Sequence, residues 1–301
     1  MRSLVWIGVV AMAAESAIAS PAAGNAALDS LVASERAFAA MSAAKGMKEA
    51  FLTYLAEQSV VFRPTAMDGR KVWEAKPPST ATLLWEPSFA EVSSAGDLGY
   101  TTGPWELHPP ADSSGTPAPP ERYLYGHFDS VWKKQRGGAW RVVADIGVSH
   151  PKPDRGGVGG GEFVAGPVLP IRTMKGGRVD LPGLDRNLSK AMRTVGTHEA
   201  VAAHATSDVR INVDGKLPSL GIEAAQARID SLAVGFFEFK SEGWGIASSG
   251  DLAYTYGLAE RFVSAKAPAA TDTCVYLHVW RQEDGRVWKL ALGVLNPLTR
   301  P

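Results

Sequence analysis

The sequence predicts an α+β protein made of two similar halves, each with helices first and antiparallel strands after them. One motif occurs twice, because residues 96–103 (GDLGYTTG) return about 150 residues later as residues 250–257 (GDLAYTYG). Trp132 and Trp140 return in the same order as Trp280 and Trp288. A repeat of this length indicates two copies of one fold. Helical patterns followed by runs of strands indicate an α+β arrangement, and 301 residues suffice for two domains.

The first half, residues 26–150, begins with two helical patterns. Residues 28–39 place apolar side chains along one stripe, Gly46 interrupts the pattern, and residues 48–57 form a second helical segment. A short strand follows at residues 60–62, whereas the periodicity of residues 69–75 fits a helix or a strand. Further strands are predicted at residues 83–85, 89–93, 98–105, 123–133 and 140–146.

The second half, residues 184–298, repeats this order. Helices are predicted at residues 184–195, 199–205 and 222–232, with a strand at 209–213 between the last two and further strands after them. The segment between the halves, residues 151–183, is rich in glycine and proline and is predicted to be a linker. Its more apolar part, residues 163–171, is a candidate for docking on a neighbouring domain. Residues 109–120 are predicted to form a mobile surface loop.

The first 20 residues resemble a signal peptide. Arg2 is followed by an apolar run, residues 4–14, that is too short to span a bilayer, and residues 17–19 (AIA) form a small-x-small cleavage site. We therefore expect cleavage before Ser20 and a periplasmic or secreted protein without a membrane anchor. The alternative is an unstructured cytoplasmic leader.

Composition excludes several kinds of partner. The 31 basic residues balance 31 acidic ones, so no surplus of positive charge points to nucleic acid.

The single cysteine, Cys274, cannot form an intramolecular disulfide. His198 and His204 are six residues apart, not the three or four that place two ligands on one helical face. No phosphate-binding or nucleophile motif is present, and we expect neither a metal nor a cofactor.

Three motifs carry a resemblance to a known family. They are Glu35-Arg36-x-Phe38, the motif at residues 96–103, and residues 126–135 (GHFDSVWKKQ) followed by residues 140–147 (WRVVADIG). Together they resemble the DUF4440 branch of the NTF2-like superfamily, which also contains ketosteroid isomerases and SnoaL-type cyclases. The first half matches along nearly its whole length and the second half more loosely. The resemblance implies two cone-shaped domains in tandem, each a curved antiparallel sheet packed on its N-terminal helices, with a pocket often at the mouth. Enzymes, binding proteins and dimerisation modules all use this fold, so fold does not give function.

Glu35 is the first candidate for acid–base chemistry. It lies on the apolar stripe of the first helix, where a carboxylate is costly unless it is hydrogen-bonded or faces a wet cavity. It is either a pocket carboxylate with a raised pKa or a structural anchor. Asp185 occupies the corresponding place in the second half, and its presence favours the anchor.

His127 and Asp129 are the second candidates, and Asp145 is the third. Tyr125, His127 and Asp129 alternate along one strand and therefore share a face, which either lines the cone or is exposed to solvent. An imidazole beside a carboxylate can transfer protons near neutral pH. Asp145 ends a strand, where it either caps a turn or forms a carboxylate pair with Glu35.

Aromatic residues are the candidates for contacting a ligand. The paired tryptophans, Trp132 with Trp280 and Trp140 with Trp288, are predicted to fill the two cores. Trp73 and Trp105 have no such counterparts and fit either a pocket wall or a core. Tyr54, on the second helix, and Tyr125 complete the predicted ligand-binding set.

Two functions remain open. The favoured one is a non-catalytic exported module that binds a small apolar molecule or a protein. The alternative is an isomerase, cyclase or dehydratase in which Glu35, His127, Asp129 or Asp145 moves protons. In both, the halves are expected to pack sheet to sheet as an intramolecular pseudo-dimer. An open cavity that contains two or more of these polar groups would favour the enzyme, and a cone filled by tryptophans would favour the module.

Overall fold

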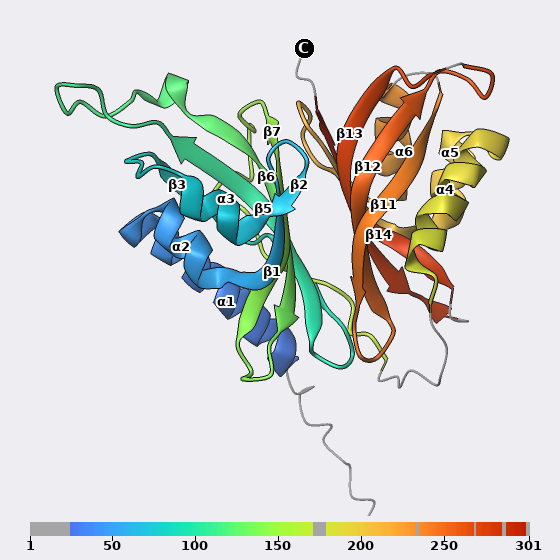
Figure 1. The fold of residues 1–301 in the computed structure, drawn as a ribbon, viewed down its shortest axis with the longest axis horizontal. Coiled ribbons are helices and arrows are strands. Elements are labelled where there is room, and N and C mark those ends of the chain that lie inside the picture. Colours follow the sequence, from blue (N-terminus) through green and yellow to red (C-terminus); the bar gives the residue numbers. More distant parts are fainter. Residues whose placement is uncertain (1–24, 171–178, 233–234, 268, 285–286, 299–301) are drawn as a thin grey trace, which may run out of the picture.

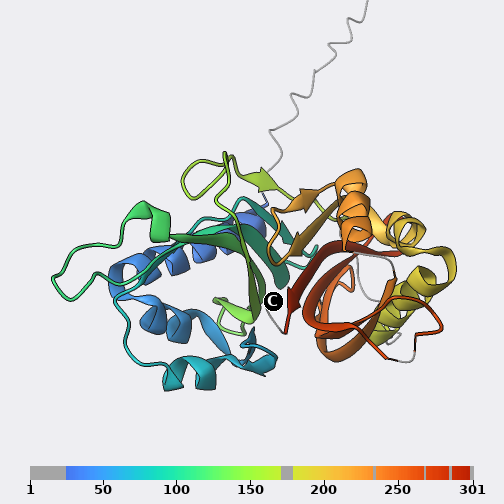
Figure 2. The ribbon, with the colours of Figure 1, turned by 90° about the horizontal axis from the view of Figure 1, so that it is seen from above.

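The protein has four layers, with two sheets face to face in the middle and helices on both outer sides (Figures 1 and 2). The computed structural model describes residues 25–170, 179–232, 235–267, 269–284 and 287–298. The predicted signal peptide lies outside the described residues, as does part of the predicted linker. Among the described residues, no helix is both long and apolar enough to cross a membrane.

The first half contains an eight-stranded sheet covered by three helices. Its helices are α1 (Ala26–Lys45), α2 (Met47–Tyr54) and α3 (Gly69–Ala75), with a 3₁₀ turn η1 (Pro120–Arg122); its strands are β1 (Leu55–Phe62), β2 (Ala66–Asp68), β3 (Thr82–Trp85), β4 (Phe89–Val92), β5 (Leu98–His108), β6 (Leu124–Lys134), β7 (Trp140–His150) and β8 (Val164–Ala165). Helix α1 begins where the Asn25 side chain accepts a hydrogen bond from the Leu28 N–H, and it ends at Gly46, whose φ of 90° is unfavourable for other residues.

The strand order in the first sheet is β2-β1-β7-β6-β5-β4-β8, with β3 also paired to β5. Most neighbours are antiparallel, as predicted, but β1 lies parallel to β7 and β4 parallel to β8. A sheet that is antiparallel throughout is therefore a wrong expectation. The chain passes through α3 and the five strands β2 to β6 before β7 returns beside β1, and such a long crossover permits parallel pairing.

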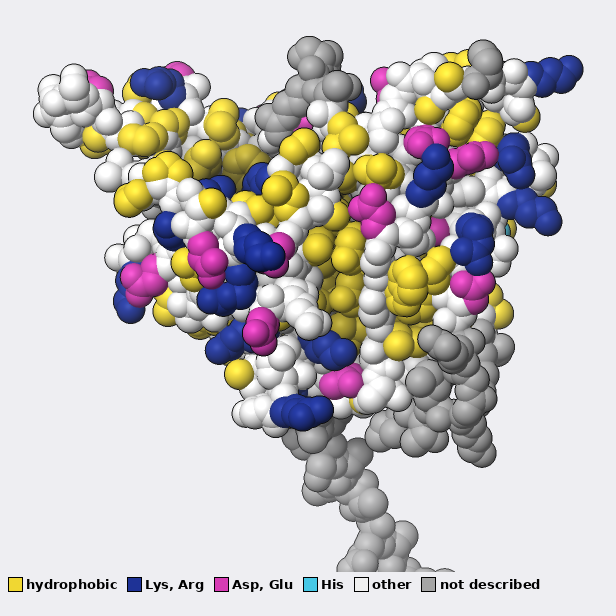
Figure 3. Space-filling model, in the orientation of Figure 1, with side chains coloured by type: hydrophobic (Ala, Val, Ile, Leu, Met, Phe, Trp, Pro, Cys, Tyr) yellow, Lys and Arg dark blue, Asp and Glu magenta, His cyan; other side chains and the backbone are white. Residues whose placement is uncertain are grey.

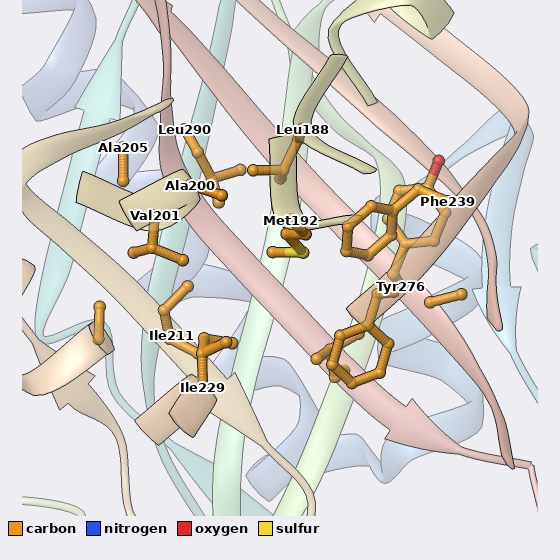
Figure 4. Packing of buried hydrophobic residues seen from close by; sticks show 14 of the residues in the cluster. Leu188, Met192, Ala200, Val201, Ala205, Ile211, Ile229, Phe239, Tyr276 and Leu290 are labelled. Atoms are coloured by element: carbon orange, nitrogen blue, oxygen red, sulfur yellow. The ribbon is translucent and has the colours of Figure 1, made fainter. Parts of the chain in front are cut away.

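The second half contains a six-stranded sheet with the same plan. Its elements are α4 (Leu181–Val195), α5 (Thr197–His204), β9 (Ala205–Val213), β10 (Ser219–Leu220), α6 (Ile222–Ser231), β11 (Phe236–Ile246), β12 (Leu252–Phe262), β13 (Asp272–Gln282) and β14 (Trp288–Pro297). The order is β10-β9-β14-β13-β12-β11, and β9 again lies parallel to the last strand. Figure 4 shows the core of this half, in which Leu188 and Met192 of α4 pack near Phe239 and Tyr276 of the sheet.

The repeated motif has the same structure in both halves. Gly96 and Gly250 open it in the left-handed region, with φ values of 68° and 71°. Gly103 and Gly257 close it at a point where the neighbouring chain comes very near. A Cβ on either glycine would lie 2.0 Å from a backbone oxygen, that of Glu86 or of Lys240. Glycine is required at both ends of the motif for these geometric reasons, whereas a common origin of the halves stays a prediction.

The structure differs from the prediction at the end of the second helix, and it decides two segments that the sequence left open. The second helix ends at Tyr54, and β1 begins directly after it at Leu55. Residues 69–75, which the periodicity left open, form α3. Within the linker, β8 pairs with β4 and the Leu169 side chain is buried between the sheets. The apolar part of this segment therefore belongs to the packed structure of the protein.

The two sheets bury a shared apolar layer. It contains residues of β1, β4, β5, β6 and β7 from the first sheet and of β12, β13 and β14 from the second, among them Phe62, Leu98, Val131, Ile146, Leu252, Val275, Leu277, Val279 and Leu292. Figure 3 shows hydrophobic side chains in the groove between the halves. Burial of an apolar layer on both sheets stabilises the association of the halves.

Candidate functional site

A cavity of about 710 Å³ lies in the first half, between its helices and its sheet. Residues of α1, α2, α3, β1, β3, β5, β6 and β7 contribute to it, and residues 296–298 of the second half complete its wall. Its apolar lining is formed by Phe38, Met47, Phe51, Phe62, Leu83, Trp73, Trp85, Trp105, Leu107, Phe128, Ile146 and Leu298. A concave site with mainly apolar walls and a few polar groups is typical of small-molecule sites.

The aromatic rings that line this cavity are packed against one another. Trp73 stacks on Phe51 with ring centroids 3.9 Å apart, and Phe51 meets Phe38 edge to face at 4.8 Å. Trp85 also packs edge to face on Phe38, at 4.8 Å. These contacts fix the rings before any ligand enters, which reduces the ordering cost of binding.

Asp145 and Ser130 form a polar pair on the sheet side of the cavity. They are direct partners in the register of β6 and β7, so their side chains lie side by side on the same face. The Ser130 hydroxyl donates to Asp145 Oδ2 at 2.8 Å. Asp145 is only 8% exposed. Burial raises the pKa of its carboxyl, and the opposing effects of Ser130, Arg63 and Lys76 do not cancel this increase.

Glu35 lies in the core of the first half and does not line the cavity. It accepts hydrogen bonds from Trp85 Nε1 at 2.6 Å, Thr101 Oγ1 at 2.6 Å and Trp132 Nε1 at 2.9 Å. Burial, which outweighs these bonds, raises the pKa of Glu35 to about 7. Its position is that of a clamp between α1 and strands β3, β5 and β6.

Asp185 is bonded in the same manner in the second half. It accepts hydrogen bonds from Ser241 Oγ at 2.6 Å, Tyr276 OH at 2.7 Å and Thr255 Oγ1 at 3.1 Å. His278 Nδ1 lies 2.8 Å from Asp185 Oδ1, the oxygen that also accepts from Thr255. The shared geometry of the two acids agrees with the interpretation of Glu35 as an anchor.

The strand face that carries Tyr125, His127 and Asp129 points towards the second sheet. The expectation that it lines the cone is wrong, because on β6 it is the alternate residues, Phe128 and Ser130, that line the cavity. Tyr125 and His127 are partly exposed. Asp129 is fully buried, and both its carboxylate oxygens accept from Asn212 Nδ2, at 2.8 and 3.0 Å. Burial raises its pKa to about 7.

His127 makes no contact with Asp129 that would serve proton transfer. Its Nδ1 lies 2.9 Å from Nε2 of His150, and burial lowers the pKa of His127 to about 3. Tyr125 lies near Lys152, whose Nζ is 5.6 Å from the centre of its ring. The structure thus keeps both residues away from the cavity.

The predicted aromatic ligand set divides in two. Trp73 and Trp105 line the cavity, whereas Tyr54 stacks on Phe38 at 5.0 Å behind the cavity wall. Of the eight predicted site residues, the structure brings together three, Asp145, Trp73 and Trp105.

Sequence reasoning missed Ser130, Arg63, Lys76 and Asn296. Ser130 could have been found, because strand alternation places it with Phe128 on the opposite face from His127. Arg63 and Lys76 follow a strand and a helix without any motif. Asn296 donates from Nδ2 to the backbone oxygen of Gly147 at 2.9 Å and comes from the other half of the chain. No group of three or more potential metal ligands occurs among the residues described.

Comparison with known proteins gives solved structures only, since no family model and no curated protein matches this chain. The chain is similar to a putative calcium/calmodulin-dependent protein kinase II association domain from Xanthomonas campestris, with 12% identity and a TM-score of 0.33 over 41% of this chain and 87% of that one. It is similar to an NTF2-like protein with a cystatin-like fold from Novosphingobium aromaticivorans, with 16% identity and a TM-score of 0.33 over 40% and 82% of the two chains.

A ketosteroid isomerase-like protein from Erwinia carotovora atroseptica is similar at 17% identity and a TM-score of 0.33, over 39% of this chain and 93% of that one. This likeness concerns fold alone. The fold itself follows from the elements described above: in each half, helices cover one face of a mostly antiparallel sheet whose first and last strands are neighbours. The predicted α+β fold, with N-terminal helices packed on a mostly antiparallel sheet in each half, is confirmed.

Proposed function

We propose that the first half binds a small, mainly apolar molecule in its cavity. The observation that carries this proposal is the cavity itself, with about 710 Å³ of space and a preformed wall of stacked aromatic rings. Buried apolar surface supplies most of the affinity in such sites, and the few polar groups orient the ligand.

Binding is favoured over catalysis because the predicted acid–base groups do not converge. Of Glu35, His127, Asp129 and Asp145, only Asp145 lines the cavity. Glu35 is occupied by three donors, and Asp129 is occupied by Asn212. We expected an enzyme to place two or more of these groups in the cavity. The cavity contains one of them, Asp145.

One observation favours a second candidate, an acid–base enzyme of the isomerase, cyclase or dehydratase kind. Asp145 lies in an apolar cavity, burial raises its pKa, and Ser130 orients it. A buried carboxyl with a raised pKa and an orienting hydroxyl is suited to act as a general acid or base. Under this candidate, Asp145→Asn would abolish turnover of a substrate that the variant still binds, whereas a pure binding protein has no turnover to lose.

The second half serves, in this proposal, as an intramolecular partner of the first. Two equivalent contacts support it: Asp97 accepts from the backbone N–H of Ser248, and Asp251 accepts from that of Ser94. Such reciprocal contacts are typical of two-fold symmetric dimers. The second half also supplies residues 296–298 to the cavity wall. Export to the periplasm or beyond remains a prediction from residues 1–20.

The test uses the neutral fluorescent probe N-phenyl-1-naphthylamine and the purified full-length chain. Gly147 lines the cavity, and a Cβ there would meet its nearest neighbours at 3.5 and 3.6 Å, so the Gly147→Phe variant can fold with its ring in the cavity. We expect the wild type to bind the probe and Gly147→Phe to bind at least about tenfold more weakly.

Gly137→Phe is the matched control, because Gly137 is exposed in a turn and a Cβ at that position would have no other atom within 4 Å. Equal affinity in the wild type and in both variants would contradict the proposal. Mass spectrometry of molecules that co-purify with the wild type, but not with Gly147→Phe, would then identify the natural ligand.

A further inference from the structure

Two cationic side chains lie at one end of the cavity. Arg63 follows β1 and is exposed at the mouth, while Lys76 caps the C-terminal end of α3 and is partly buried. The Lys76 Nζ lies 3.9 Å from the centre of the Trp73 ring, so its charge faces the aromatic wall. The mainly apolar cavity therefore has two positive charges at one end.

Neither cation has a carboxylate partner at ion-pair distance among the residues that the structure describes, although many surface cations of this protein have one. The two cations repel each other, and burial together with the charge of Arg63 lowers the pKa of Lys76. A partly buried positive charge without a counter-ion is costly. An anion placed between these side chains would remove that cost.

Asp145 is the carboxyl that acts on both cations from within the cavity. It does not replace a counter-ion, because it is buried and is held by the Ser130 hydroxyl on the sheet side. Burial raises the pKa of its carboxyl, whereas the charges of Arg63 and Lys76 act in the opposite direction.

We infer that the ligand is an amphipathic anion, with an apolar ring or chain against Trp73 and Phe51 and a single carboxylate-type head group paired with Arg63 and Lys76. This inference rests on the proposed function and specifies its ligand class. Oxyanions suit both partners, since a guanidinium and an ammonium donate charge-assisted hydrogen bonds.

The test compares two probes that differ by a single anionic group. 8-Anilinonaphthalene-1-sulfonate is N-phenyl-1-naphthylamine with one added sulfonate, which stands for the carboxylate-type head group. We expect Lys76→Met and Arg63→Gln each to weaken binding of the anionic probe about tenfold, the loss expected for one charge-assisted contact. Affinity for the neutral probe should stay within about twofold, because neither substitution replaces an aromatic ring of the cavity wall.

Control variants separate the head-group site from general charge effects. Lys71→Met removes an exposed lysine of α3, and Arg136→Gln removes an exposed arginine of the β6–β7 turn. Neither should change the affinity of either probe, and Lys76→Arg should retain the anionic preference. Increasing salt should weaken binding of the anionic probe only.

The outcomes distinguish this inference from the proposed function. If the neutral probe binds and is blocked by Gly147→Phe, but Lys76→Met and Arg63→Gln leave the anionic probe unaffected, the cavity binds apolar molecules and the head-group inference is overturned. If neither probe binds the wild type, both proposals fail. An equal loss in Lys71→Met would show a nonspecific effect of surface charge and would also overturn the inference.

Discussion

Asp97 and Asp251 occupy the same position in the two copies of the repeated motif, and each accepts a hydrogen bond from a serine of the other half. Asp97 Oδ2 lies 3.0 Å from the Ser248 nitrogen, and Asp251 Oδ2 lies 3.1 Å from the Ser94 nitrogen. Asp251 also accepts from the Ser94 and Ser249 hydroxyls. The turn between β4 and β5 is thus hydrogen-bonded to the turn between β11 and β12.

Removing either acid should destabilise the protein unequally. Asp251 is fully buried whereas Asp97 is partly exposed, so Asp251→Ala leaves donors without solvent access. We expect a loss of about 1–3 kcal/mol in the free energy of unfolding for Asp251→Ala and a smaller loss for Asp97→Ala. Urea denaturation measures both, with the exposed Asp154→Ala as a control. Equal small effects would show that these contacts add nothing.

The bond between Asp129 and Asn212 should behave as a matched buried pair. Asn212→Leu leaves a buried carboxyl without its donor and should cost about 1–3 kcal/mol. The double variant Asp129→Leu/Asn212→Leu should recover most of this loss, because the second half already has Leu277 where the first has Asp129. A double-mutant cycle from chemical denaturation checks this, and strictly additive losses would argue against the pairing.

Glu35→Ala should reduce stability without removing the cavity. The Trp85 and Thr101 donors lose their acceptor, whereas the Trp132 indole can still donate to Thr101 Oγ1 at 3.0 Å. Each orphaned buried donor costs about 1–3 kcal/mol. Thermal and chemical denaturation should show the loss, while the neutral probe still binds the folded fraction. Unchanged stability with lost turnover of a substrate would instead make Glu35 catalytic.

Stability should fall as the pH rises towards neutrality. The pKa of Glu35 rises from 4.5 to about 7 on folding because of burial, so the folded state holds a proton that the unfolded state has released. This contribution is complete below pH 4.5 and is lost as the pH rises through about 7, by about 3 kcal/mol in order of magnitude.

Glu35→Gln isolates that effect, because glutamine does not titrate. The stability of the wild type minus that of the variant should shrink as the pH rises from about 4.5 to about 7. Denaturation curves over this range test the sign, and a difference that grows with pH would refute it.

The segment around β8 should detach when Gly166 is replaced. The Gly166 N–H donates to the Ala90 oxygen at 2.7 Å, and a Cβ there would lie 2.8 Å from the Glu91 Cβ. Gly166→Val should therefore expose residues 151–170 to limited proteolysis. Gly161→Val, where a Cβ meets nothing closer than 4.0 Å, is the control. Identical cleavage rates would show that β8 does not hold this segment.

Most helices and strands could be predicted from the sequence, because the spacing of apolar residues and the positions of glycine determine them locally. The stripe of α1, the turns at Gly96 and Gly250 and the tryptophan cores follow from periodicity and glycine geometry. The parallel pairing of β1 with β7 could not be predicted, because the pairing of strands far apart in the chain produces no local sequence pattern. Strand alternation grouped Tyr125, His127 and Asp129 correctly on one face, but it could not tell which side of the sheet meets the second half.

Only some residues of the cavity could be predicted from the sequence, because the others follow no local pattern. Asp145, Trp73 and Trp105 carry chemistry that attracts notice in a sequence. Arg63 and Lys76 look like any other charged residues in the sequence, and only their positions in the cavity wall distinguish them. Asn296 comes from the far end of the chain, so no local pattern could connect it with Gly147.

The wall formed by residues 296–298 has a consequence for biosynthesis. These residues are added by the ribosome long after the first half, yet they border a chamber whose other sides are made from that first half. A nascent chain therefore cannot hold a ligand in its finished surroundings until both halves have been translated. Occupancy of the chamber is thereby coupled to synthesis of the second half.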